Sequence, residues 1–335
     1  MSELKTAGSE ASMSPETGKK CPYEYVMFDP RSIPEVQATN EAIFVKGDVY
    51  GIEVTNKKLA DRCVANLDPQ HSGGDAMASA VEVAITWDIP PEQAVLATMK
   101  PDIDAVGAMA VLEMRRCGEE ISEESKGRIL FIADADRAST HSWPGQQDLP
   151  SNENPWPSTF FQDPRVIAIL SATVSDFKIP LASRVLSMEN YLKDGVIPAL
   201  YEKQVDEARK QLIMAIEKGE MKAELITNSK IAVVVGRHRD AMTIGYSLSP
   251  IVVALNPEFS PNPKVPAYAK YTVAQYKIGL VDFIGALKEL NDIDPAVTDQ
   301  AKWGGSPGII GSPQGVSSKL SPEKVAEIIT KYIKE

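Results

Sequence analysis

The first half of the chain alternates between short apolar runs and longer stretches with helical spacing. We expect a strand at residues 41–47, a helix at 73–87, a strand or a short helix running into one at 92–99, and a helix at 102–116. An apolar run that ends in acids follows at 128–136. This alternation is typical of a parallel sheet covered by helices, in which ligands bind at the carboxyl ends of the strands.

The second half opens with the clearest helix of the sequence, residues 198–218, whose apolar positions form one stripe opposite a charged face. Two apolar runs of strand length follow at 231–236 and 251–255. The last helix is expected to start at Ser321, a good N-cap, with Pro322 as its first residue. The remaining segments are a mixed stretch at 267–280, a helix at 281–290 and a glycine-rich loop.

These elements predict an α/β fold with a mainly parallel N-terminal domain and a smaller α/β C-terminal domain. The expected bounds are a flexible tail at 1–22, a first domain at 23–195, a linker helix at 196–220 and a second domain at 221–335.

Composition narrows the function classes. No run among the 335 residues approaches the roughly 18 apolar positions of a spanning helix, so membrane insertion is not expected. The first twenty residues lack the apolar core of a secretory signal, and Cys21, Cys63 and Cys117 are too widely spaced for a disulfide framework, which favours a cytoplasmic protein. A net charge of −11 disfavours long nucleic acids as partners but allows a small anionic substrate, which local cations and backbone amides can bind.

Acidic residues gather where strands of the first half are expected to end. Carboxylate and imidazole groups are ligands for divalent Mn, Mg, Fe or Zn, and several carboxylates in one crevice repel one another unless a cation compensates them. The sequence therefore predicts a metal site. The alternatives are structural: Asp104 caps the helix that follows, and Asp136 is an ordinary turn residue. The candidate ligands are Asp68, His71, Asp102, Asp104, Asp134 and Asp136.

Two segments of the second half are candidates for binding an anion. Arg237, His238 and Arg239 follow the expected strand at 231–236, where they either face the crevice or form a solvated turn. The glycine-rich loop at 304–318 offers backbone amides and hydroxyls, or else is a long structural loop. Its candidate substrate-binding residues are Gly304, Gly305, Ser306, Gly311, Ser312, Ser317 and Ser318.

The stretch KPDIDAVGAMAVL resembles the first motif of the DHH phosphoesterase superfamily, which includes RecJ-like nucleases and family II pyrophosphatases. Pro101, Asp102, Asp104, Ala105 and Gly107 match that motif. FIADAD is similar to the second motif, a strand that ends in a metal-bridging aspartate, and the loop at 304–318 is similar to the substrate loop of the family's second domain. The chain departs from the family pattern because it has threonine at position 98, where the motif has histidine, and contains no Asp-His-His triplet.

The resemblance implies a metal-dependent hydrolase, a phosphoesterase acting on a small phosphorylated or nucleotide-like compound. It implies manganese as the cofactor, with Mg, Fe or Zn as alternatives, and His71 and Asp104 as catalytic residues. Two other functions stay open on the same scaffold. One is a module that binds a small anion without hydrolysing it, and the other is a metal-dependent enzyme with a non-phosphate substrate.

Overall fold

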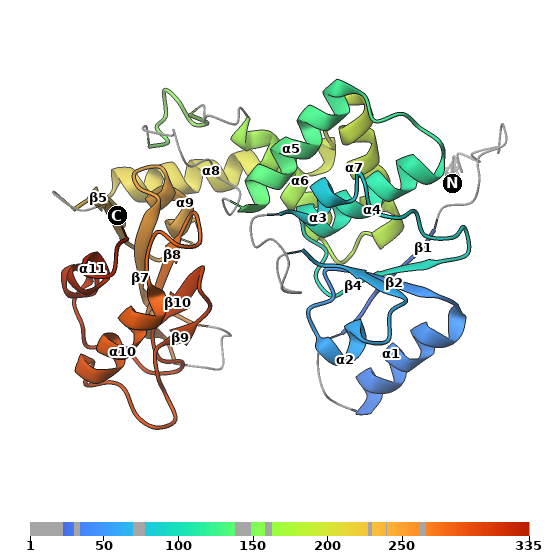
Figure 1. Cartoon of the computed structure of the whole chain (residues 1–335). Coiled ribbons are helices and arrows are strands. Elements are labelled where there is room, and N and C mark those ends of the chain that lie inside the picture. The colour runs from blue at the N-terminus through green and yellow to red at the C-terminus, as the bar shows by residue number, and fades with distance from the viewer. Residues whose placement is uncertain are drawn as a thin grey trace, which may run out of the picture.

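The computed structural model describes residues 23–29, 34–69, 78–137, 149–157, 163–226, 230–238, 240–260 and 266–334. Two separate sheets form in this part of the chain, one of four strands and one of six. Figure 1 shows them in two halves of the molecule, with a long helix, α8, between them. The predicted α/β fold is confirmed, while the predicted domain bounds stay a prediction.

The N-terminal sheet is entirely parallel, in the order β1-β4-β2-β3. Its strands are β1 (Glu24–Met27), β2 (Val49–Ile52), β3 (Ala65–Leu67) and β4 (Val95–Thr98). All four residues of β4 are buried, as expected for a central parallel strand covered on both faces. Leu96 packs into the core on one face, and Val95 and Ala97 pack into the core on the other.

Helices cover both faces of this sheet. In Figure 1, α3 to α7 lie on one side, and α1 and α2 lie on the other. Their bounds are α1 Pro34–Lys46, α2 Lys57–Ala60, α3 Ala80–Val83, α4 Ile103–Arg116, α5 Glu123–Arg137, α6 Pro164–Ser175 and α7 Leu181–Asp194.

Two predicted strands of this half are helices. Residues 41–47, expected as a strand, are the end of α1, which buries Val36, Asn40 and Ile43 at the i, i+4, i+7 spacing of one helix face. Residues 128–136 belong to α5, where Ile129, Ile132 and Ala133 are buried at helical spacing. The short apolar runs hid this period, because such runs fit a strand or a buried helix equally well. The helix expected at 73–87 is seen only as α3, and residues 73–77 lie outside the described residues.

A buried ion pair ties α4 to β1. Glu113 and Arg116 are both buried on α4 and form a salt bridge. Glu113 also accepts hydrogen bonds from the Tyr25 hydroxyl at 2.8 Å and the Tyr23 backbone N–H at 3.3 Å. Burial alone would raise the pKa of Glu113, but the hydrogen bonds from Arg116, Tyr25 and Tyr23 outweigh burial and lower it.

The helix predicted at 198–218 is confirmed as a 3-10 turn, Ala199–Tyr201, followed by α8 (Glu202–Glu217). On α6, Arg165 binds the Asp206 carboxylate with both Nε and Nη2, at 2.8 and 2.9 Å, and the Glu202 carboxylate at 3.0 Å. These contacts hold the start of α8 against α6, and α8 extends from there towards β5 (Figure 1).

The C-terminal sheet is mixed, in the order β5-β6-β7-β8-β10-β9, with only β6 and β7 parallel to each other. The strands predicted at 231–236 and 251–255 are confirmed as β6 and part of β7. The bounds are β5 Met221–Leu225, β6 Ile231–Gly236, β7 Ile251–Phe259, β8 Tyr268–Gln275, β9 Gly304–Gly305 and β10 Ile309–Gly311. One face packs on α10 (Phe283–Ile293) and α11 (Pro322–Thr330), and the other packs on α8 and α9 (Ala241–Tyr246).

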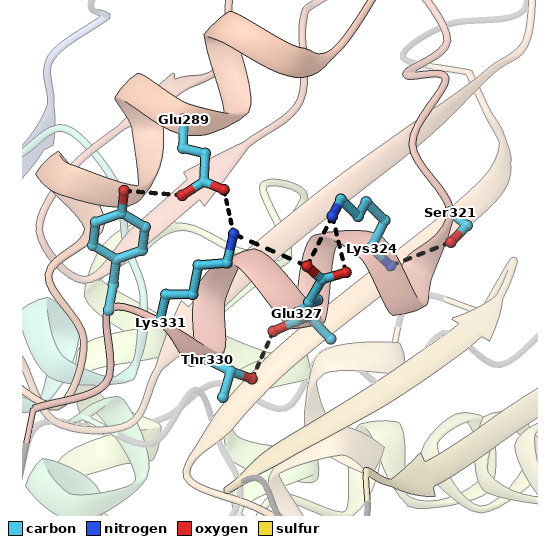
Figure 2. Close-up of polar contacts among 8 residues, drawn as sticks. Glu289, Ser321, Lys324, Glu327, Thr330 and Lys331 are labelled. Carbon is cyan, nitrogen blue, oxygen red and sulfur yellow. Dashed lines mark hydrogen bonds and ion pairs between the residues drawn. The ribbon is translucent and has the colours of Figure 1, made fainter.

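The predicted start of the last helix is confirmed. The Ser321 hydroxyl accepts a hydrogen bond from the Lys324 backbone N–H at 3.2 Å, and Pro322 is the first residue of α11. Figure 2 shows that Lys331, just after α11, reaches Glu289 on α10, with 2.6 Å between nitrogen and oxygen, and that Lys324 pairs with Glu327. These side chains are partly exposed, so each pair contributes little to stability.

None of the described helices is long and apolar enough to cross a lipid bilayer.

Candidate functional site

Five acidic residues lie in one electrostatic environment at the carboxyl edge of the parallel sheet. Glu53 follows β2, Asp68 follows β3, and Asp102 lies shortly after β4, on three strands that are neighbours in the sheet. Asp104 on α4 and Asp136 on α5 complete the group, which we call the acidic cluster. Burial and, to a lesser extent, the negative charges of the other four acids together raise the pKa of Glu53 to about 10.

Asp102 joins the cluster and also caps a helix. Its Oδ1 accepts a hydrogen bond from the Ala105 backbone N–H at 3.1 Å, which makes it the N-cap of α4. Its Oδ2 lies 3.2 Å from the Nζ of Lys100. Burial lowers the pKa of Lys100, but the charges of Asp102, Asp136 and Glu53 outweigh burial and raise it. The field of the acids therefore extends to the Lys100 ammonium at the surface.

Asp104 has a different structural role from the one expected. Its carboxylate does not cap α4, where Asp102 does, but accepts hydrogen bonds from the start of α3. The backbone N–H groups of Ala80 and Val81 both donate to it at 2.8 Å, and the Ser79 hydroxyl donates as well. Asp104 is fully buried, and burial raises its pKa while these three bonds oppose the shift. Asp104 therefore holds α3 against α4 next to the cluster.

Glu53 was not among the residues predicted from the sequence. Its backbone has φ 53°, and it is the one non-glycine residue with positive φ in the part of the chain that the structure describes. The Asn66 side chain holds the next residue, Val54, by accepting from its N–H at 3.2 Å and donating to its carbonyl at 3.1 Å. A Cβ at Gly51 would lie 2.3 Å from Asn66 Oδ1, so glycine leaves room for this clamp. An acid directly after a strand is the sequence signal that could identify Glu53. The apolar pattern predicts a strand at 41–47 instead of at 49–52.

The predicted ligands of the 128–136 run come from a helix. Asp134 and Asp136 lie on α5, so neither ends a strand, which corrects the expected second motif. Asp136 acts on the pKa of Glu53 and Lys100, which places it in the cluster. Asp134 is not among the charges that act on either group. His71 lies outside the described residues.

Coordination geometry for a metal ion is not formed by the residues that the structure describes. Among them, no group of three or more His, Cys, Asp or Glu side chains is arranged so that it could hold one. The acidic cluster therefore contains side chains of the kind that bind metal ions, and their charges interact. The described residues do not form a set of ligands around one point.

Two residues of the segment 237–239, which was predicted to bind an anion, make contacts within the protein. Arg237 is exposed and donates to the Glu258 carboxylate. The His238 Nδ1 accepts from the Asp240 backbone N–H at 3.3 Å, which closes the turn before α9. Arg239 lies outside the described residues.

Three serines of the 304–318 loop bind neighbouring elements. The Ser312 hydroxyl accepts from the Tyr271 N–H of β8 at 2.9 Å, and the Ser317 hydroxyl accepts from the Ala269 N–H at 2.9 Å. The Ser318 hydroxyl donates to Asp294 at 2.7 Å. These contacts favour the alternative of a structural segment.

The glycines of this loop form a small hairpin. Gly304 and Gly305 of β9 pair with Gly311 and Ile310 of β10, and the Ser306 N–H donates to the Ile309 carbonyl at 2.8 Å to close the turn. Gly305 has φ 151°, and a Cβ there would lie 2.2 Å from the Ile309 carbonyl oxygen. The loop predicted at 304–318 therefore contains the edge of the second sheet.

No protein-family model matches the sequence, and a search of curated proteins finds no significant match.

Proposed function

We propose that this protein is a metal-dependent hydrolase, a phosphoesterase acting on a small phosphorylated or nucleotide-like compound. The observation that carries the proposal is the acidic cluster, with Glu53 in a strained backbone conformation at its centre. Backbone strain of this kind concentrates at functional sites, where the surrounding structure holds it. The resemblance of residues 100–112 to a DHH motif supports the same reaction class.

The acids suit a hard divalent ion by their chemistry. Carboxylate oxygens are typical ligands of Mn and Mg, and the pKa of Glu53 is raised by burial and then by the charges of the other acids, which a bound cation would offset. Glu53, Asp68, Asp102 and Asp136 are the residues that would hold it, together with His71 as a prediction. Bound there, the ion would lower the pKa of a water molecule and so supply the nucleophile for attack on phosphorus.

Other residues at the carboxyl edge of the parallel sheet hold these ligands in place. Asp104 fixes α3 against α4 through three hydrogen bonds, and the Asn66 clamp fixes the turn that carries Glu53. Lys100 has a largely exposed side chain within the field of the acids, where its ammonium can meet an incoming anion.

One observation favours a module that binds a small anion without hydrolysis. Both carboxylate oxygens of Asp104 already accept backbone hydrogen bonds, so this residue is occupied structurally. The two functions differ in whether a metal is required.

A metal titration separates them. Adding Mn²⁺ to chelator-treated protein should raise its melting temperature and start hydrolysis of a generic phosphodiester such as bis(p-nitrophenyl) phosphate. Glu53→Gln and Asp68→Asn should each lose both effects, whereas Asp61→Asn, which removes an exposed acid near α2, should keep both. If Mn²⁺ changes neither the melting temperature nor the hydrolysis of the wild-type protein, the hydrolase proposal is wrong.

A further inference from the structure

A cavity of about 540 Å³ lies between α6 and α8, away from the residues of the acidic cluster. Ser171 and Ala172 of α6 line one wall, and Gln204 and Arg209 of α8 line another, with Trp156 closing the site. A cavity of this volume matches the small-molecule class of binding sites.

Arg209 is a buried cation in the wall of this cavity. Its exposed fraction is 5%, and its guanidinium carbon lies 4.0 Å from the centre of the Trp156 ring. Among the described residues, no carboxylate lies within ion-pair distance of this guanidinium and no acceptor within hydrogen-bond distance of it. Burial lowers the pKa of Arg209 to about 10, and the charge of Asp240, which also lines the cavity, opposes this shift. A buried charge with no directly bound anion is costly, so the site favours an added negative group.

A second polar group in the same wall has no partner. The Ser171 hydroxyl is buried and makes no hydrogen bond in the structure, although a hydroxyl can both donate and accept. Buried polar atoms are nearly always satisfied, so this hydroxyl leaves an unmet hydrogen bond just behind the cavity wall.

Asp176, the acidic residue that lines the cavity at the end of α6, already accepts hydrogen bonds from the protein. The Asp176 carboxylate accepts from the Tyr201 hydroxyl and, at 2.8 Å, from the Lys178 backbone N–H. These bonds hold the pKa of Asp176 below its usual range, the Tyr201 bond most of all. The Lys178 side chain is exposed and also lines the cavity, where it adds a positive charge.

We propose that this cavity binds a small oxyanion, a phosphate or carboxylate group on a compact molecule, with Arg209 as the main contact. The planar guanidinium matches both groups because it can donate two parallel hydrogen bonds to two oxygens. The site is independent of the proposed hydrolase centre, since none of its described lining residues belongs to the acidic cluster.

The test is a titration of chelator-treated protein with inorganic phosphate and with succinate, at constant ionic strength, followed by calorimetry and by the melting temperature. The chelator removes any metal, so a failed hydrolase proposal leaves this result unchanged. We expect saturable binding of at least one of the two anions. Arg209→Met should weaken it by about 10-fold or more, while Arg62→Met, which removes an exposed arginine between α2 and β3, should leave it unchanged.

Ser171→Asp gives a second readout that does not require losing the arginine. A carboxylate at this position would add a negative charge to the cavity wall, so we expect loss of anion binding. The proposal is overturned if neither anion binds saturably to the wild-type protein, or if Arg209→Met and Ser171→Asp both bind as tightly as the wild type.

Discussion

Asp294, at the end of α10, anchors the segment that leads into the glycine-rich loop. Its Oδ2 accepts hydrogen bonds from the Trp303 indole at 2.8 Å and the Ser318 hydroxyl at 2.7 Å. Its Oδ1 accepts from the backbone N–H groups of Ala296 at 3.0 Å and Lys319 at 3.1 Å. Asp294 is 3% exposed, so one buried carboxylate joins both ends of the loop to α10.

Replacing Asp294 by asparagine should destabilise this half of the protein by about 3 kcal/mol. An amide keeps one acceptor oxygen for the two backbone donors but turns an N–H₂ group towards the Trp303 indole, which leaves a buried donor unsatisfied at a cost of about 1–3 kcal/mol. The Ser318 hydroxyl can rotate and accept instead. The two retained bonds lose their ionic character, which removes about 1 kcal/mol more.

The loss should depend on pH. Burial alone would raise the pKa of Asp294, but the bonds from Ser318, Ala296, Lys319 and Trp303 outweigh burial and hold it below its usual range. A carboxylate with a lowered pKa in the folded state contributes its stability fully above the unfolded pKa of about 3.9, and that contribution disappears as pH falls through the folded pKa. The difference between wild type and Asp294→Asn should therefore be constant near neutral pH and shrink below about pH 4.

Urea unfolding at pH 7 and at decreasing pH, followed by tryptophan fluorescence, measures both effects. Asp292→Asn is the matched control. It removes the same charge, but from an exposed side chain that lies two residues before Asp294. Hydrogen exchange should show loss of protection at residues 303–319 in Asp294→Asn alone. Equal stability of the two variants would refute the proposed anchoring.

Three further predictions, with five substitutions between them, test the packing of the fold. Gly107→Ala should destabilise the protein by about 1–3 kcal/mol, because its Cβ would lie 2.9 Å from a Val81 methyl group. Gly127→Ala, on α5 with open space around it, should stabilise the protein by up to about 1 kcal/mol. Thermal unfolding compares the two variants. Glu113→Gln should cost about 3 kcal/mol in urea unfolding by breaking a buried ion pair, against less than about 1 kcal/mol for the exposed Glu123→Gln. Ser321→Ala should cost about 1 kcal/mol in the same assay through loss of its cap, and a cost near zero would contradict the capping geometry.

Periodicity predicted the elements whose apolar pattern was long or whose ends carried clear signals. The helix at 102–116, the helix at 198–218 and the Ser321 cap are present as expected. Two short apolar runs, 41–47 and 128–136, became helices because their burial depends on a helix face that only tertiary packing reveals. Local propensity for β structure was overridden in both.

The rule that ligand groups gather at the carboxyl ends of parallel strands predicted part of the acidic cluster. It placed Asp68 and Asp102 correctly at strand ends, and Asp136 reached the same region from a helix instead. Glu53 could not be predicted, because no strand was expected at 49–52 and because the next residue is held by the Asn66 clamp, a contact between neighbouring strands. The structural contacts of the loop serines were hidden for a related reason, since a hydroxyl in a sequence gives no sign of the backbone N–H that it will bind.

The cluster contains two buried acids with raised pKa values, and the contrast between their surroundings bears on function. Asp104 accepts three hydrogen bonds from protein donors at the start of α3, which oppose the rise in its pKa that burial causes. Glu53 lies in the same field, and its pKa is raised to about 10 by burial and by the acids around it. A group held protonated at neutral pH by its neighbours becomes a strong anionic ligand as soon as a cation enters, because the ion reverses the sign of the local field. Glu53, more than the aspartates of the motif, is therefore the residue whose replacement by glutamine decides between the metal-dependent hydrolase and the metal-free module.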